Sequence, residues 1–306
     1  MTAVVHLIAP AKLNLYLRVV GRRPDGYHEL ETLFERLDLS DELTFEDHPS
    51  ELHLSCPDPS LSCGADNLIL KAARLLQQHT GTARGARIHL TKRIPIAAGL
   101  GGGSSDAATT LVGLNRLWNT GCSASELLEL AARLGSDVPF FLCGHSFSVG
   151  RGRGELLEPV MVTTMLNQVL VTPKTQLSTQ EVFREAQFSL TASKPSITIL
   201  LHALRNGSLG ELAKGFYNDL QPEAIRRCPV MTEIHAILRA HGCLATLASG
   251  SGPSVFGLCH DAPQATRVAR QVRERGSPDW FIQVVRTDDA PLMAGWHLKE
   301  TARGSP

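Results

Sequence analysis

The chain has 306 residues, which predicts about two domains at roughly 150 residues each. Its 30 Lys and Arg residues balance 30 Asp and Glu residues, with 12 His in addition, and this balance argues against a protein that coats nucleic acid or an anionic membrane, since both need a basic surface. The hydrophobic fraction of 43% and the charged fraction of 20% exclude a disordered chain and are typical of a globular protein with a sizeable core.

Cysteine usage and the apolar stretches predict the compartment. The seven cysteines are odd in number and none forms a C-x-x-C pair, so we expect reduced thiols in a cytoplasmic protein rather than a disulfide framework or a zinc ribbon. The first residues have no basic segment and reach Lys12 too soon for a signal peptide. The longest stretch without Asp, Glu, Lys or Arg, 240–260, contains four glycines and Pro253, which favours strand–loop–strand over a membrane span.

The N-terminal part of the chain is rich in strand signals. β-Branched residues and partial alternation predict strands at 4–9, 13–20, 29–37, 42–46, 51–55 and 86–91. The tetrapeptide Arg23-Pro24-Asp25-Gly26 is a turn signal, because Pro presets φ and Gly accepts a positive φ. Apolar residues at helical spacing behind Asp66, the expected N-cap, predict a helix over 66–79.

Helical patterns become more frequent further along. A glycine-dense loop at 99–103 precedes a predicted helix over 104–118, and Ser123 with Glu126 forms a capping box for a helix that ends near Gly135. The uncharged segment 160–173 contains the expected join between two domains, 1–162 and 163–306. The second domain is expected to contain helices over 179–186, 196–204, 230–241 and 263–275, and strands over 243–248, 254–258 and 281–286.

Strands and helices mixed without strict βαβ alternation indicate an α+β fold. The helix over 263–275 carries four arginines, which we interpret as a solvated outer face rather than an anion site. The tail after Leu298 is expected to be mobile.

The strongest chemical signal is the segment 95–106, PIAAGLGGGSSD. Backbone without side chains can turn its N–H groups toward a ligand, and a helix start adds free donors and a partial positive charge. The segment therefore favours a phosphate cradle, with an ordinary glycine-rich turn as the alternative. No Lys follows the glycines, so it is not a P-loop. Ser104 and Ser105 suit either helix capping or a metal ion on the phosphates.

Two charged residues stand in apolar surroundings. Asp137 precedes Val138-Pro139, and since Pro139 disfavours helix at Val138, we expect a constrained bend on which Asp137 is either an N-cap or a reaction group. Lys12, in PAKLNL, is expected to be partly buried next to an anion, or to extend along a strand edge to solvent.

Two polar loops complete the set of candidates. Tyr27 and His28 follow the turn at 23–26, and an aromatic ring beside an imidazole suits a flat heterocycle, although an exposed hairpin has the same composition. The segment 248–254, ASGSGPS, is either a further loop of backbone donors or a plain turn between strands.

Taken in order, these segments resemble the three motifs of the GHMP kinase superfamily: PAKLNL at 10–15, GLGGGSSDAA at 99–108 and SGSGPS at 249–254. More narrowly, GRRPDGYHELET at 21–32, LGSDVPFF at 134–141 and LASGSGPSVFGL at 247–258 are similar to the branch that phosphorylates a cytidine-diphosphate ester of methylerythritol in the non-mevalonate route to isoprenoid precursors. The resemblance spans roughly residues 8–260.

The resemblance implies a ribosomal-protein-S5-domain-2-like N-terminal domain, a ferredoxin-like C-terminal domain and an active site between them. It also implies transfer of the ATP γ-phosphoryl group to the 2-hydroxyl of the methylerythritol part, with Mg²⁺ present. It assigns Lys12 and Asp137 as the catalytic pair, with Asp137 accepting the hydroxyl proton and Lys12 steadying charge on the attacking oxygen.

The binding residues are assigned by the same resemblance. The ATP-phosphate loop comprises Pro95, Ile96, Ala97, Ala98, Gly99, Leu100, Gly101, Gly102, Gly103, Ser104 and Ser105, and Ser105 is the candidate Mg²⁺ ligand. Asn67 and Lys92 fall where relatives hold adenosine. The cytidyl-diphosphate substrate is expected to contact Asn14, Tyr27, His28, Thr179 and Phe183. The chain departs from the common pattern after Thr179, where Gln180 replaces an expected proline.

Other functions are possible on the same residues. The first alternative is a GHMP-type kinase with a mevalonate- or homoserine-like acceptor, against which the string GRRPDGYH speaks. A nucleotide-binding regulator without catalysis is disfavoured by the presence of both Lys12 and Asp137. An RNA-binding module is disfavoured by the zero net charge.

Overall fold

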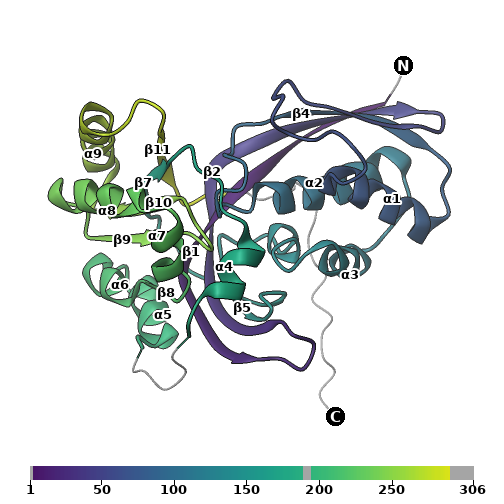
Figure 1. Cartoon of the computed structure of the whole chain (residues 1–306). Coiled ribbons are helices and arrows are strands. Elements are labelled where there is room, and N and C mark those ends of the chain that lie inside the picture. Colours follow the sequence, from purple (N-terminus) through teal and green to yellow (C-terminus); the bar gives the residue numbers. More distant parts are fainter. Residues whose placement is uncertain (1–2, 189–193, 290–306) are drawn as a thin grey trace, which may run out of the picture.

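Two β-sheets with helices packed on them make up the described part of the chain, residues 3–188 and 194–289 of this computed structural model (Figure 1). Helices and strands mix without a regular βαβ order, which confirms the predicted α+β class. The tail after Leu298, for which we expected mobility, lies outside the described residues.

A long antiparallel ribbon joins the two halves of the fold. It consists of β1 (Val4–Arg22) and β2 (His28–His48), each of which the sequence predicted as two separate strands. The ladder continues through irregularities instead of ending, the first of them between Pro10 and Lys12, where Pro10 has no N–H to donate. The turn between the strands is the predicted one, with Gly26 at φ +87° donating its N–H to Arg23 O at 3.1 Å.

The first sheet has seven strands and is covered by three helices. Its main path is β3 (Leu52–Ser55), β4 (Gly85–Thr91), β2, β1 and β8 (Tyr217–Asn218), while β5 (Phe147–Gly152) pairs with β2 and β6 (Leu156–Pro159) with β5. The helices are α1 (Leu68–Thr80), α2 (Gly102–Trp118) and α3 (Ala124–Leu134). Helix α2 lies against β1 and β2, and α1 and α3 pack on α2. The predicted capping box of Ser123 and Glu126 is present, and Gly135 follows the helix as predicted.

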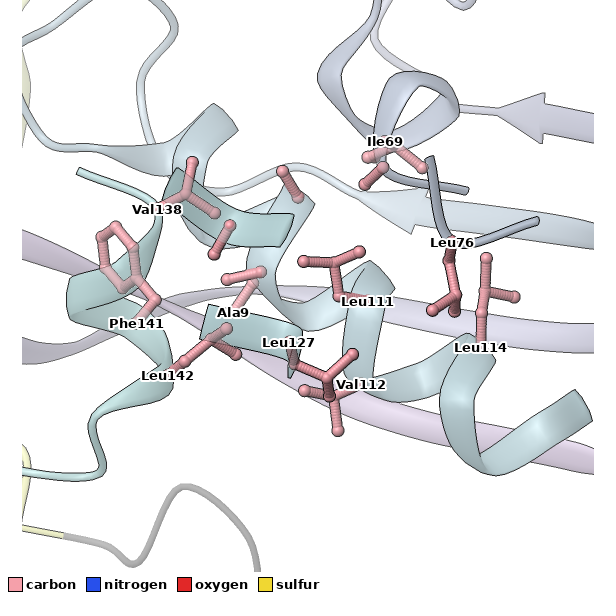
Figure 2. Close-up of a cluster of buried hydrophobic side chains, with 14 of the residues drawn as sticks. Ala9, Ile69, Leu76, Leu111, Val112, Leu114, Leu127, Val138, Phe141 and Leu142 are labelled. Atoms are coloured by element: carbon pink, nitrogen blue, oxygen red, sulfur yellow. The ribbon is translucent and has the colours of Figure 1, made fainter. Parts of the chain in front are cut away.

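The core of this half anchors α2 and the segment after α3. Figure 2 shows Leu111 and Val112 of α2 among side chains from α1, α3 and the 3-10 helix η1 (Pro139–Leu142), with Phe141 from η1 and Val138 just before it. All four of these side chains are at most 2% exposed. Because buried apolar contacts of this kind resist displacement, the backbone on both sides of Asp137 is fixed by the core.

The second sheet has the order β11-β7-β10-β9 and is antiparallel throughout. Its strands are β7 (Asn167–Thr172), β9 (Ala245–Ala248), β10 (Val255–Cys259) and β11 (Phe281–Arg286), and its crossover helices are α8 (Val230–Ala240) and α9 (Ala262–Arg275). This is the β-α-β-β-α-β arrangement of ferredoxin-like folds, as the resemblance implied. On β7, Val169 and Val171 pack in the cluster with α8 and α9, whereas Leu170 packs in the cluster with β1.

Short elements connect the two sheets, and sequence patterns predicted few of them. They are α4 (Thr179–Glu185), α5 (Ile197–Arg205), α6 (Leu209–Gly215) and α7 (Gln221–Arg227). The sequence predicted α4 and α5 but not α6, α7 or the strands β5 to β8. Strands β6 and β8 are too short to show a periodic pattern, and β7 lies in the segment that was expected to contain the join between the domains. Strand β8 pairs in parallel with β1 at Tyr16 and Leu17, which ties this connecting region to the first sheet.

A buried acidic residue lies where β2 meets the second sheet. Glu35 is fully buried and accepts hydrogen bonds from Gln168 Nε2 at 2.7 Å and Thr287 Oγ1 at 2.6 Å. Burial raises the pKa of the Glu35 carboxyl from its ordinary 4.5 to about 7, although both hydrogen bonds oppose the shift.

Three smaller predictions concern the surface and the thiols. All seven cysteines are free, which confirms reduced thiols. The four arginines of α9 (Arg267, Arg270, Arg273 and Arg275) are exposed, as expected of an outer face. Among the helices of residues 3–188 and 194–289, none is both long and apolar enough to cross a bilayer.

Candidate active site

Lys12 and Asp137, separated by most of the N-terminal half of the sequence, meet in space. The Lys12 ammonium lies 3.5 Å from Asp137 Oδ2, and it donates to Asn14 Oδ1 at 2.5 Å and to Gly99 O at 3.0 Å. Lys12 is 3% exposed, whereas the Asp137 side chain is 32% exposed. The pair therefore presents a carboxylate to solvent with a buried cation behind it.

Electrostatics couple the two groups. Burial lowers the pKa of the Lys12 ammonium, and the negative charge of Asp137 opposes that shift. The ring of Phe34 lies 5.7 Å from the ammonium and provides a further favourable contact. Without Asp137, the buried ammonium would be left with neutral partners, which is costly.

The position of Asp137 depends on a turn that the sequence predicted incompletely. Asp137 lies in the turn between α3 and η1, as expected, but Val138 has helical dihedral angles (φ −61°, ψ −42°), which the sequence analysis had predicted Pro139 to disfavour. The reason is that Pro139 is the first residue of η1, where its fixed φ is compatible with a helix. The Val138 carbonyl accepts from Phe141 N at 3.2 Å and so begins this helix.

The glycine-rich loop leads directly into α2. The helix begins at Gly102, two residues before the predicted start, because Gly101 at φ +69° is its N-cap. At Gly101 a Cβ atom would lie 2.9 Å from both the Lys12 side chain and the Phe141 ring. At Gly99 (φ +76°) it would lie 2.1 Å from Ser249 O. The loop is thus pressed against Lys12 on one side and against the 249–254 segment on the other.

Two side chains at this helix start have unused hydrogen-bonding atoms. The hydroxyl of Ser105 and the Oδ1 atom of Asp106 are buried without a hydrogen-bond partner among the described residues. Ser105 is therefore not a helix cap, which was one of its two sequence interpretations. Buried oxygens without partners are uncommon in proteins and suit a ligand that brings donors or positive charge.

Lys92, a predicted adenosine contact, has a side chain that is 5% exposed and lies between two carboxylates. Its ammonium donates to Asp41 Oδ2 at 2.5 Å and to Asp106 Oδ2 at 2.8 Å. Burial raises the pKa of the Asp106 carboxyl, and Lys92 opposes that shift. Through Lys92, which directly follows β4, the ion pairs connect the N-terminal part of α2 to β2. The adenosine contact of Lys92 stays a prediction.

Asn67, the other predicted adenosine contact, caps α1. Its Oδ1 accepts from Ile69 N at 2.9 Å and its Nδ2 donates to Ser62 O at 2.7 Å. The predicted cap, Asp66, was wrong: its carboxylate instead accepts from Ser62 Oγ at 2.8 Å. An amide one residue closer to the helix competes better for the first free N–H groups.

The loop at 249–254, called the third loop below, is held in place by two residues that the sequence analysis did not select individually. Ser249 Oγ accepts from Asn14 N at 3.3 Å and donates to Gly99 O at 2.9 Å. Asn218 Nδ2 donates to Ala248 O and Gly250 O, both at 2.8 Å, and so fixes the loop from behind. The sequence signal for Ser249 was its place in the SGSGPS motif; Asn218 gave no signal of its own.

The predicted substrate residues gather next to this region. The His28 ring stacks on Phe183 with centroids 5.6 Å apart and an interplanar angle of 24°. Thr179 Oγ1 lies 2.8 Å from Ser251 Oγ, which connects α4 to the third loop. Tyr27 is 57% exposed and does not take part in that stack. Burial, with a smaller contribution from Arg22, lowers the pKa of His28, so its ring is neutral near pH 7 and offers one donor and one acceptor.

Asn14, a predicted substrate residue, is bonded directly to Lys12 of the predicted catalytic pair. Its amide Nδ2 donates to Thr32 Oγ1 at 2.8 Å while its Oδ1 accepts from Lys12. A separate cavity of about 320 Å³, lined by Lys194, Tyr217, Asp219 and six other residues, contains none of the predicted site residues. The candidate site is therefore defined by the meeting of the motif loops rather than by that cavity.

Comparisons with known proteins match most of the chain. The family models described as "GHMP kinases N terminal domain" and "GHMP kinases C terminal" match residues 67–145 and 200–278. A protein of Pelotomaculum thermopropionicum named 4-diphosphocytidyl-2-C-methyl-D-erythritol kinase is 42% identical over 93% of this chain and 98% of its own length. A protein of the same name from a Synechococcus species is 40% identical over 92% of this chain and 94% of its own.

Solved structures show the same relationship. A crystal structure of 4-(cytidine 5'-diphospho)-2C-methyl-D-erythritol kinase superposes with a TM-score of 0.77 at 37% identity, covering 92% of this chain and 99% of the other. A homoserine kinase from Cytophaga hutchinsonii and the L. major mevalonate kinase each give a TM-score of 0.73, at 17% and 16% identity, covering 93% and 94% of this chain and 94% and 97% of their own. At such low identity the latter two share the fold alone.

Proposed function

The chain belongs to the 4-diphosphocytidyl-2-C-methyl-D-erythritol kinase family of the GHMP kinases, and from this membership we propose that it transfers the γ-phosphoryl group of ATP to the 2-hydroxyl of 4-diphosphocytidyl-2-C-methyl-D-erythritol. The products are the 2-phosphate and ADP. The observation that carries the proposal is the Lys12–Asp137 pair, 3.5 Å apart, whose ammonium also donates to the glycine-rich loop at Gly99. A mevalonate- or homoserine-like acceptor is not favoured, because the solved kinases of those types share the fold alone.

In the proposed reaction Asp137 accepts the proton of the attacking hydroxyl. The hydroxyl oxygen forms a bond to the γ-phosphorus, the bond from that phosphorus to the β–γ bridging oxygen breaks, and ADP leaves with the electron pair. A loose transition state needs orientation and charge neutralisation more than a strong base. The partly exposed carboxylate can reach a substrate, and the buried Lys12 ammonium behind it steadies negative charge on the attacking oxygen.

ATP is proposed to bind through the loop 95–105, with its phosphates at the N-terminus of α2, where free N–H groups and the helix dipole favour anions. The unpartnered Ser105 hydroxyl fits a Mg²⁺ ion, since that ion prefers hard oxygen ligands and keeps substrate phosphates among them. When bound, Mg²⁺ neutralises charge on the β- and γ-phosphates. Asn67 and Lys92 remain the proposed residues near adenosine.

The acceptor is proposed to bind along Asn14, Tyr27, His28, Thr179 and Phe183. The stacked rings of His28 and Phe183 offer a flat surface to the cytosine, and the neutral imidazole can both donate to and accept from a base edge. We further propose domain limits of 1–162 and 163–306 and a cytoplasmic location.

The test is direct observation of the product. The full chain is incubated with ATP, Mg²⁺ and 4-diphosphocytidyl-2-C-methyl-D-erythritol, and phosphorus NMR is expected to show a new phosphomonoester beside an intact diphosphate. Mevalonate, homoserine and an acceptor-free mixture serve as controls. Faster turnover of either control alcohol, or ADP release without a new ester, contradicts the proposal.

A further inference from the structure

Arg153 is a cation whose place in the site has no assigned purpose. It lies in the turn between β5 and β6, where its backbone N–H donates to Glu155 Oε2 at 2.6 Å and its Nε donates to Glu155 Oε1 at 3.4 Å. Its guanidinium carbon lies 5.1 Å from the centre of the Tyr27 ring. Among the hydrogen bonds of the described residues, none uses its Nη1 or Nη2 atoms, so the outer fork of the guanidinium remains free to bind a ligand.

The same turn touches the proposed base. A Cβ atom on Gly154, the residue after Arg153, would lie 3.9 Å from Asp137 Oδ1. In the other direction, Tyr27 directly precedes His28, whose ring stacks on Phe183. Arg153 therefore lies between two parts of the proposed site. On one side are the aromatic rings proposed to bind the cytosine, and on the other is the carboxylate of Asp137, proposed to accept the proton of the reacting hydroxyl.

We propose that Arg153 binds the diphosphate of the acceptor substrate, an inference that rests on the function proposed above. In that substrate the diphosphate connects the cytidine to the polyol, so it must pass between the two ends of the site. Its negative charges need a cation there, and Lys12 is buried and already engaged by Asp137, Asn14 and Gly99. A planar guanidinium matches two phosphate oxygens at once, and here Glu155 and Tyr27 hold it in place.

The experiment compares ligands that differ only in the diphosphate. Calorimetric titration of the full chain with cytidine 5'-diphosphate and with cytidine gives an affinity ratio for the wild type, Arg153→Gln and Arg153→Lys. Arg151→Gln is the matched control, because Arg151 lies two residues away and pairs with Glu158 at 2.9 Å.

In Arg153→Gln, we expect cytidine 5'-diphosphate to bind about 10- to 100-fold more weakly, the range for losing a charge-assisted contact, while cytidine binding stays near the wild-type value. In steady-state assays the KM for the acceptor should rise while the KM for ATP and kcat hold. Arg153→Lys should retain more diphosphate affinity than Arg153→Gln, and Arg151→Gln should resemble the wild type.

Equal losses for the two ligands in Arg153→Gln, an unchanged affinity ratio, or the same loss in Arg151→Gln each overturn the assignment. Equal affinities of Arg153→Lys and Arg153→Gln overturn it as well. The wild-type turnover measured beside these titrations separates the two proposals: a wild-type chain that forms no 2-phosphate contradicts the proposed function, whereas an active wild type with an unaltered Arg153→Gln ratio contradicts the role of Arg153 alone.

Discussion

Ser249 offers a sharp test of how the motif loops cooperate. Its hydroxyl is fully buried, accepts from the Asn14 N–H at 3.3 Å and donates to Gly99 O at 2.9 Å. Replacing Ser249 with Ala removes both bonds. Gly99 O keeps its bond from Lys12, but the Asn14 N–H is left without that partner.

A second variant is expected to lose a similar amount of unfolding free energy. A buried polar group that loses its partner costs about 1–3 kcal/mol of unfolding free energy. Ser254 lies in the same loop, is equally buried, and shares a 2.7 Å hydrogen bond with Thr172 that does not involve the glycine-rich loop. Ser254→Ala should therefore lose a similar amount of stability without disturbing the phosphate site.

Urea unfolding and steady-state kinetics together separate a loss of stability from a displacement of the glycine-rich loop. Ser249→Ala is expected to lower kcat/KM for ATP by about 10- to 100-fold, because small displacements of a positioning loop cost rate steeply, whereas Ser254→Ala keeps a value close to the wild type. If the two variants lose kcat/KM for ATP equally, the effect comes from stability and the reasoning about the shared Gly99 carbonyl is refuted.

Five further substitutions test the rest of the site and fold. Asp137→Asn should lower kcat by about 10²–10⁴-fold, and retention of more than about a tenth of the wild-type kcat rules out the base role. Tyr27→Ala and His28→Ala should raise the KM for the cytidyl substrate and leave the KM for ATP unchanged; an equal rise in both argues against their placement. Gly99→Ala introduces a Cβ 2.1 Å from Ser249 O at a positive φ, and should abolish ATP binding in calorimetry or prevent folding as seen by circular dichroism; near-normal binding contradicts the loop contact. Because the pKa of Glu35 is about 7 when folded and 4.5 ordinarily, the folded chain binds the proton more tightly, so its unfolding free energy should fall by about 3 kcal/mol between pH 4.5 and 7. Glu35→Gln should remove that part of the slope in urea titrations, and an unchanged slope disproves the assignment.

The sequence predicted the candidate site residues better than it predicted the strands around them. Lys12 and Asp137 were selected from their apolar surroundings and motif positions, and the structure brings them together. The ribbon of β1 and β2 was predicted as four strands because Pro10 and the other interruptions read as breaks. They are irregularities in a continuous ladder, which only the pairing partner reveals.

Residues that support the site through tertiary contacts were beyond the reach of sequence patterns. Asn218 fixes two carbonyls of the third loop, and Asp41 binds Lys92, yet neither has a distinctive local context. Arg153 is similar: its importance depends on the proximity of Tyr27 and Asp137, which come from distant parts of the chain.

One detail of β1 determines which way the phosphate loop faces. Lys12 binds two successive loop carbonyls, Gly99 O through its ammonium at 3.0 Å and Leu100 O through its backbone N–H at 2.9 Å. In a trans peptide the C=O and N–H vectors point in opposite directions. With both oxygens drawn toward the strand, the amide hydrogens of Leu100 and Gly101 are turned outward. A single lysine therefore both lies beside the proposed base and directs these amide dipoles toward the side where the nucleotide is proposed to bind.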